Sequence, residues 1–328
     1  MNMTTLFSSY LGMYATQSFF HALIASALAD GAIHAWNIRN PLVLQRFRFA
    51  LIVLALFSFP LYQFLNPGRS SLLFHSTALF DSSRWLAVEL WNGVSLSHLF
   101  LALLALTALI FFVQELVPIL RHAIEATGDA LEGERPAEGS IVYRALSSLP
   151  VKKPDVLIID DDDLVLFSAT GKRPVIYVST GLARDLNEEQ IQAALAHEIA
   201  HVARSRRPVL LVVFFLRMAL FFNPIALIEF RRAVRNEEKI CDDVASDLTH
   251  KPRVLADTLR KFYSSSEGGE ARLSQVTAPA DLEEYSHNLQ LASRIRRLEQ
   301  EESAPAEGAW IPFVVVFIVA AGLNYFVV

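Results

Sequence analysis

Two histidines one helical turn apart, His197 and His201, with Glu198 between them, are the residues of this chain best suited to chemistry. Residues at i and i+4 lie on one face of a helix, so the two imidazoles can bind the same metal ion. Tetrahedral zinc takes nitrogen ligands of this kind. Glu198 lies one residue further round the helix and can reach a water molecule beside the metal as a general base. The spacing therefore predicts zinc-assisted hydrolysis of the kind that HExxH metallopeptidases perform.

The residues around this motif predict the helix that it needs. Asn187 is followed three residues later by Gln190, which is the pattern of a capping box at a helix N-terminus. Residues 191–203 are rich in Ala, Leu and Ile and contain neither Pro nor Gly. A chance pair of surface histidines is the alternative, but it leaves these apolar flanks unexplained.

A catalytic zinc keeps three protein ligands, and acidic candidates for the third follow in residues 235–243. Glu238 and Asp242 are spaced i, i+4 on an expected helix. One of them can bind zinc while the other accepts a hydrogen bond from a ligand imidazole. Glu237 and Asp243 are expected to face solvent. A solvated acidic patch is the alternative, although apolar residues such as Ile240 alternate with the acidic ones.

Three stretches of the chain resemble BlaR/MecR-type integral-membrane zinc peptidases, which are related to the HtpX-like and CAAX-processing proteases. They are Gly171–Leu182 (GKRPVIYVSTGL), Leu220–Ile225 (LFFNPI) and Arg235–Asp243 (RNEEKICDD). The resemblance covers roughly residues 140–300, and the N-terminal hydrophobic hairpin is similar too. It implies a gluzincin-like fold, peptide-bond hydrolysis, Glu238 as the third zinc ligand and Asp242 as the residue that orients a ligand. Those sensors carry a C-terminal extracellular ligand domain, and none is expected here after the last hydrophobic segment.

Two further side chains have open interpretations. His287, followed by Arg294, resembles a stretch of the HtpX-like relatives in which the histidine steadies the oxyanion of the tetrahedral intermediate, a role that a hydrogen-bond donor can fill. This sequence lacks the prolines that usually follow, and a surface histidine is the alternative. Cys241 is the lone cysteine. A redox thiol is conceivable there, but simple packing in a helix core is the favoured interpretation.

Composition indicates a membrane protein, since 53% of the residues are hydrophobic and only 19% are charged. Uncharged segments long enough to cross a bilayer predict four transmembrane helices. Gln17 and His21 in the first of them should face other helices rather than lipid. The expected spans are 1–29, 49–65, 94–113 and 310–328. The fold class predicted is therefore an α-helical membrane protein with an α+β zincin-like metallopeptidase domain.

The apolar segment 209–228 is the exception among these segments. A single crossing there would put Glu238 on the opposite side of the bilayer from His197 and His201. Basic residues flank both ends, and Asn223-Pro224 interrupts the middle. We therefore expect a re-entrant hairpin or helices on the membrane surface. The predicted domains are three spans in 1–120, a cytoplasmic zinc metallopeptidase domain in 121–309 with 209–228 as a membrane-associated hairpin, and a last span in 310–328.

Three short strands are expected before the zinc helix, at 155–159, 164–168 and 175–179. Leu164–Ser168 is the candidate edge strand on which an extended substrate peptide can add by backbone pairing. The acidic run Asp160–Asp163 between two strands is interpreted as a solvated turn. A calcium site is the alternative, but consecutive carboxylates lack the ligand spacing of known calcium loops.

These features predict a zinc metalloendopeptidase of the bacterial inner (cytoplasmic) membrane, with Zn²⁺ as cofactor. Three functions compete: a signalling protease that cleaves a cytoplasmic regulator, an HtpX-like protease for membrane-protein quality control, and a non-catalytic membrane sensor or scaffold. A purely structural zinc has no use for Glu198, which argues against the third. Expected partners are a protein or peptide substrate, the lipid bilayer, and a cytoplasmic repressor or membrane partner, without direct contact to nucleic acid.

Overall fold

The computed structural model describes residues 6–117, 132–169, 174–205, 209–265, 290–300 and 310–328. It divides into two compact units. The helical unit consists of Met1–Gly128, Val209–Asn236 and Pro305–Val328. The mixed unit consists of Asp129–Pro208 and Glu237–Ala304, and it contains all the candidate metal ligands that the structure describes.

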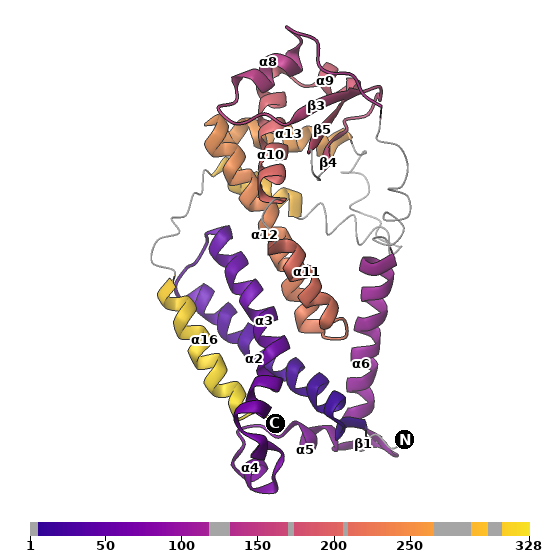
Figure 1. Ribbon diagram of the computed structural model, residues 1–328, viewed down its shortest axis with the longest axis vertical. Helices are drawn as coiled ribbons and strands as arrows, with labels where there is room; N and C mark the ends of the chain where they lie inside the picture. The colour runs from indigo at the N-terminus through magenta and orange to yellow at the C-terminus, as the bar shows by residue number, and fades with distance from the viewer. Residues whose placement is uncertain (1–5, 118–131, 170–173, 206–208, 266–289, 301–309) are drawn as a thin grey trace. The chain divides into compact units, whose positions relative to one another are not determined.

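Helices α2 (Tyr10–Ala35), α3 (Pro41–Leu65) and α16 (Trp310–Tyr325) pack side by side in the helical unit (Figure 1). Small residues of α2, Ala25 and Ala29, lie against Phe47 of α3 and Ala320 of α16 in one buried cluster. Such residues let helix backbones approach closely, as is common between membrane helices.

Two of the described helices are long and apolar enough to cross a membrane: α3, and the helix Leu96–Leu116 that α6 (Leu96–Phe111) forms with the π-helical turn η2 (Phe112–Leu116). Helix α16 is as apolar but has only 16 residues. Helix α2 has 26 residues and carries several polar side chains. Gln17 and His21 are buried on it, which confirms that they face protein rather than lipid. The expected number of four crossings stays a prediction.

The segment around Asn223-Pro224 forms a helical hairpin. Helix α11 (Val209–Ala219) ends in a turn, and α12 (Pro224–Thr249) begins with Pro224 at its first position. The side chain of Asn223 accepts hydrogen bonds from the backbone N–H groups of Ile225 and Ala226, which is how asparagine caps a helix. Val213 and Leu220 pack against residues of α2 and α3. The reversal expected at Asn223-Pro224 is therefore present in the structure.

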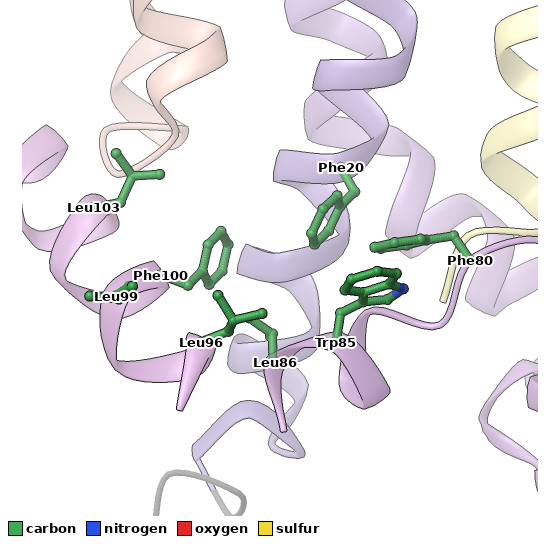
Figure 2. A pocket seen from close by; sticks show the side chains of 8 residues that line it. All are labelled: Phe20, Phe80, Trp85, Leu86, Leu96, Leu99, Phe100 and Leu103. Atoms are coloured by element: carbon green, nitrogen blue, oxygen red, sulfur yellow. The ribbon is translucent and has the colours of Figure 1, made fainter. Parts of the chain in front are cut away.

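An apolar hollow of about 360 Å³ lies in the helical unit (Figure 2). Phe20 of α2 and Phe100 of α6 line it, together with Trp85 of the short helix α5 (Ser82–Leu86) and Phe80, whose ring stacks on that of Trp85. All of its lining residues are aromatic or leucine, so the hollow holds no group able to transfer a proton or bind a metal. The chemistry must be sought elsewhere.

The sheet of the mixed unit has three strands, β3 (Asp155–Ile159), β4 (Leu166–Ala169) and β5 (Val175–Ser179). Their order is β3-β5-β4, with β3 parallel and β4 antiparallel to the central β5. The predicted bounds are right for β3 and β5, whereas β4 begins two residues later than expected. Among the described strands β4 pairs with β5 alone, so it is an edge strand as predicted.

Helix α10 (Glu188–Ser205) is at the centre of this unit, in contact with α8 (Ile141–Ser148), α13 (Pro252–Ser265) and strand β4 (Figure 1). Ile191, Leu195 and Ile199 of α10 are buried in the main apolar cluster. Burial of side chains of this size contributes roughly 1.5–3 kcal/mol each to folding. The helix that carries the histidines is therefore fixed by the core that surrounds it.

Candidate metal centre

The N-terminus of α10 is held by the predicted capping box. The side chain of Asn187 accepts a hydrogen bond from the backbone N–H of Gln190 at 2.9 Å, and the side chain of Gln190 accepts one from the N–H of Asn187 at 3.2 Å. Two backbone N–H donors at this helix end are thereby satisfied. The cap fixes where the helix begins, and the i, i+4 spacing puts His197 and His201 on one of its faces.

His197, His201 and Glu238 form the one His/Cys/Asp/Glu group among the described residues whose ligand atoms all lie within 4.8 Å of one another. The two Nε2 atoms are 3.1 Å apart. Oε2 of Glu238 lies 3.7 Å from Nε2 of His197, and Oε1 lies 3.5 Å from Nε2 of His201. Helices α10 and α12 together thus place two imidazole nitrogens and one carboxylate around a single point.

These separations fit a tetrahedral metal ion. Nitrogen and oxygen ligands about 2.0–2.2 Å from tetrahedral zinc lie about 3.3–3.6 Å from each other. The separations in the structure, of which the two to Glu238 run to different oxygens of its carboxylate, lie within a few tenths of an ångström of that range. Two nitrogens and one oxygen also make a donor set that zinc accepts, with a fourth position left for water.

Asp242 is a buried carboxylate next to this cluster. Its side chain is fully buried, and Oδ1 lies 3.2 Å from Nδ1 of His197, close enough for ion pairing although the two are not aligned as a hydrogen bond. The nitrogen of His197 that points away from the cluster thus faces a carboxylate. A carboxylate in that place fixes the tautomer and the ring orientation of a metal ligand.

Arg294 is a further member of the site. It lies in the helix formed by residues 290–299. Its Nε and Nη2 donate hydrogen bonds to the carboxylate of Asp242 at 2.8 and 2.7 Å. Its Nη1 lies 3.1 Å from Oε2 of Glu238. This one guanidinium therefore forms ion pairs with the carboxylates of both Asp242 and Glu238.

The charges of the cluster shift one another's pKa values. Burial alone would lower the pKa of His197, but Asp242 and Glu238 outweigh it and raise the pKa to about 9. Burial opposes ionisation of Glu238 and Asp242 as well, yet the histidines and Arg294 hold both carboxyl pKa values below their usual range. Both acids are thus anionic at neutral pH, as metal binding or ligand orientation requires.

Glu198 stands apart from the three ligand candidates. It is half-buried on α10 between the two histidines, and its carboxylate has no ion pair or hydrogen bond within the described part of the chain. A carboxylate beside the cluster and without such a partner is suited to accept a proton.

The expectations for three residues near the site, Glu237, Asp243 and His287, have separate outcomes. Glu237 was expected to face solvent, and this is wrong: it is buried against Arg204 of α10, whose guanidinium holds both of its carboxylate oxygens. Asp243 is partly exposed and pairs with Arg297. His287, the candidate for steadying an oxyanion, lies outside the described residues, so its role stays a prediction.

Arg294 is the member of the site that the sequence analysis does not predict. It lies in the stretch that resembles HtpX-like proteases, where the predicted role concerns His287 alone. The structure brings together His197, His201, Glu238 and Asp242, and it adds Arg294 to them.

Comparison with known families connects this geometry to a class of proteins. The family described as BlaR1 peptidase M56 matches residues 96–279, which is more than half of the chain and includes both histidines and Glu238. The chain belongs to the BlaR1 peptidase M56 family. This confirms the resemblance from which Glu238 and Asp242 were assigned.

Relatives of this M56 family member among well-described proteins are named protease HtpX homologues. The one from Thermodesulfovibrio yellowstonii is 24% identical over an alignment of 196 residues, and the similarity covers 48% of this chain and 67% of that protein. The one from Desulfotalea psychrophila is 34% identical over 79 residues (21% and 27%), and the one from Pyrococcus furiosus is 27% identical over 167 residues (40% and 57%). In the last two the similarity spans less than two thirds of the relative.

The family and the relatives' names support a membrane peptidase that acts on proteins and uses a metal. Two helices of suitable length and composition agree with a membrane location, and the cluster of two histidines and a glutamate supplies a place for the metal.

Proposed function

We propose that this M56 family member is a zinc metalloendopeptidase, with His197, His201 and Glu238 as metal ligands and Glu198 as the general base. The observation that carries the proposal is the set of ligand separations, 3.1, 3.5 and 3.7 Å, around one point beside Glu198 on the same helix. When bound there, zinc supplies Lewis-acid activation of water and of the scissile carbonyl.

The residues of the chain then perform the proton transfers. Glu198 takes the proton from the attacking water and passes it to the leaving amine. Asp242 keeps the ring of His197 oriented, and Arg294 keeps Asp242 and Glu238 anionic in a buried place. Strand β4 has a neighbour on one side only among the described strands, and an extended substrate peptide can form a further strand on its other side.

The substrate that we propose is a regulatory protein cleaved at the cytoplasmic face of the bacterial inner membrane, because the matched family is that of BlaR1. Basic residues on both sides of the apolar segment 209–228 favour this side. A repressor or a membrane partner fits this role. Quality control of membrane proteins is the second candidate, and the names of the HtpX homologues favour it.

The test of catalysis uses purified protein in detergent with zinc. Glu198→Gln should retain about one zinc per chain and lose hydrolysis of an unfolded protein substrate such as casein. His197→Ala is the matched control and should lose both. Equal loss of zinc in the two variants would refute the assignment of Glu198 as a base beside the metal.

Quantitative proteomics of cells that express the natural protein or Glu198→Gln separates the two substrate classes. One regulator that accumulates uncleaved in the variant supports signalling. A broad rise of membrane proteins supports quality control. Identical proteomes would contradict both.

A further inference from the structure

An ion pair joins the two ligand-bearing helices directly beside the metal ligands. The guanidinium of Arg204 on α10 donates from Nε to one oxygen of Glu237 on α12 and from Nη2 to the other oxygen at 2.7 Å. The Arg204 side chain is 15% exposed and the Glu237 side chain 7%. The contact is therefore a bidentate ion pair that is largely shielded from solvent.

Its place along the helices relates it to the cluster. Arg204 follows His201 by three residues, so both lie on neighbouring positions of one helix face. Glu237 directly precedes Glu238. A planar guanidinium that holds both oxygens of a carboxylate restricts distance and rotation together. The pair thus limits both sliding and turning of α12 against α10 at the point where Glu238 meets His201.

A second contact on the same side of α12 acts on His201 itself. Cys241 follows Glu237 by one helical turn, and its Sγ lies 3.5 Å from Nδ1 of His201. The other nitrogen of that ring, Nε2, faces Glu238 at 3.5 Å. In the orientation of α12 that this ion pair fixes, Cys241 lies beside Nδ1 of His201 and Glu238 lies beside Nε2 of the same ring.

The pair is poorly explained as a device for fold stability alone. Removing two charges from water is costly, and apolar replacements of buried ion pairs are often neutral or stabilising. The packing of α10 is already supplied by the apolar core around Leu195 and Ile199. An apolar pair in the same place would not fix the relative orientation of α10 and α12, because apolar contacts are not directional.

We propose that Arg204 and Glu237 are positioning residues, which fix the approach of Glu238 to His201 so that three ligands converge on one metal ion. This inference rests on the proposed function. It goes beyond it by assigning a role in metal geometry to a pair of residues that touch neither metal nor substrate.

The test compares full-length variants with zinc and with Co²⁺, whose visible absorption reports on ligand geometry. In Arg204→Met/Glu237→Leu, metal-free protein should unfold within a few degrees of the natural protein. Its metal affinity should fall about 10-fold or more, as for other residues that orient ligands, and its Co²⁺ spectrum should change. The value of kcat should fall while KM stays within about twofold.

A matched control is available on the same helix. Asp243 and Arg297 form another α12 ion pair, whose carboxylate lies five residues after Glu238. Arg297→Met/Asp243→Leu should leave affinity and spectrum unchanged. If the Arg204→Met/Glu237→Leu protein does not fold, the single variants Arg204→Lys and Glu237→Gln take its place in the test. Each keeps roughly the volume of the natural side chain but loses the bidentate contact. Arg204→Lys should retain more affinity than Arg204→Met.

Natural affinity, spectrum and kcat in the Arg204→Met/Glu237→Leu variant would overturn the inference, as would an equal effect in the control pair. Failure of the proposed function has a different signature, because then the natural protein itself would bind no stoichiometric zinc.

Discussion

Replacing Asp242 by Asn tests the role of its carboxylate in orienting His197, with little change in side-chain volume. The natural carboxylate is fully buried, faces Nδ1 of His197 at 3.2 Å and is held by two nitrogens of Arg294. The amide keeps one acceptor but removes the charge. His197 then loses the group that orients its ring, and Arg294 loses its main counter-charge.

The size of the effect follows from these contacts. Loss of a partner that orients a ligand lowers metal affinity about 10–100-fold, or about 1.4–2.7 kcal/mol. Arg294 also contacts Glu238 at 3.1 Å, so without Asp242 it is drawn toward a ligand and competes with the metal. We therefore expect the upper part of that range. Weaker charged hydrogen bonds to Arg294 should lower the stability of metal-free protein by about 1–3 kcal/mol.

Competition titration with a chromogenic zinc chelator measures the affinity, and chemical unfolding of metal-free protein measures the stability. Asp243→Asn is the matched control, adjacent on α12 and paired with Arg297 rather than with the site; it should change affinity by less than about twofold. An Asp242→Asn protein with the zinc affinity of the natural protein would refute the role given to Asp242.

Two other predictions concern the third ligand and the topology. Glu238→Ala removes a ligand and should weaken zinc binding more than Asp242→Asn does, measured by the same titration; equal or smaller loss would exclude Glu238 as a ligand. Single cysteines at Ala203 and Val234, in a Cys241→Ser background, should both be protected from a membrane-impermeant thiol reagent in intact cells, because the α11 and α12 hairpin returns to the side from which it started. A single cysteine at Val88 should be labelled. Labelling at Val234 alone would mean that the hairpin segment crosses the membrane.

Features set by nearby residues were predicted well from the sequence. The capping box of Asn187 and Gln190 depends on residues three apart, and the bounds of β3 and β5 follow from short Val- and Ile-rich runs between turn residues. The turn at Asn223-Pro224 also follows from local chemistry, since proline cannot continue a helix and asparagine caps one. The buried side of α2 was indicated by two polar residues, Gln17 and His21, in a segment that lacks charged residues up to Ala29.

Contacts between distant segments were predicted only where the family resemblance supplied them, as for Glu238 and Asp242 beside the two histidines. Arg294 follows Asp242 by 52 residues, and no periodicity connects them. Glu237 was assigned to solvent because acidic side chains are usually exposed, but Arg204, 33 residues earlier, supplies the counter-charge that allows its burial. The position of Arg204 one turn after His201 was the available hint, because a cation on the ligand face needs a carboxylate opposite.

X-ray absorption spectroscopy of the zinc-loaded protein tests the ligand set most directly, because it reports the elements around the metal and their distances. The account predicts one zinc per chain with only nitrogen and oxygen neighbours at about 2.0–2.2 Å, two of them imidazoles, and loss of one imidazole in His201→Ala. Zinc–sulfur scattering at about 2.3 Å would place Cys241 among the ligands, and it would contradict the site of His197, His201 and Glu238.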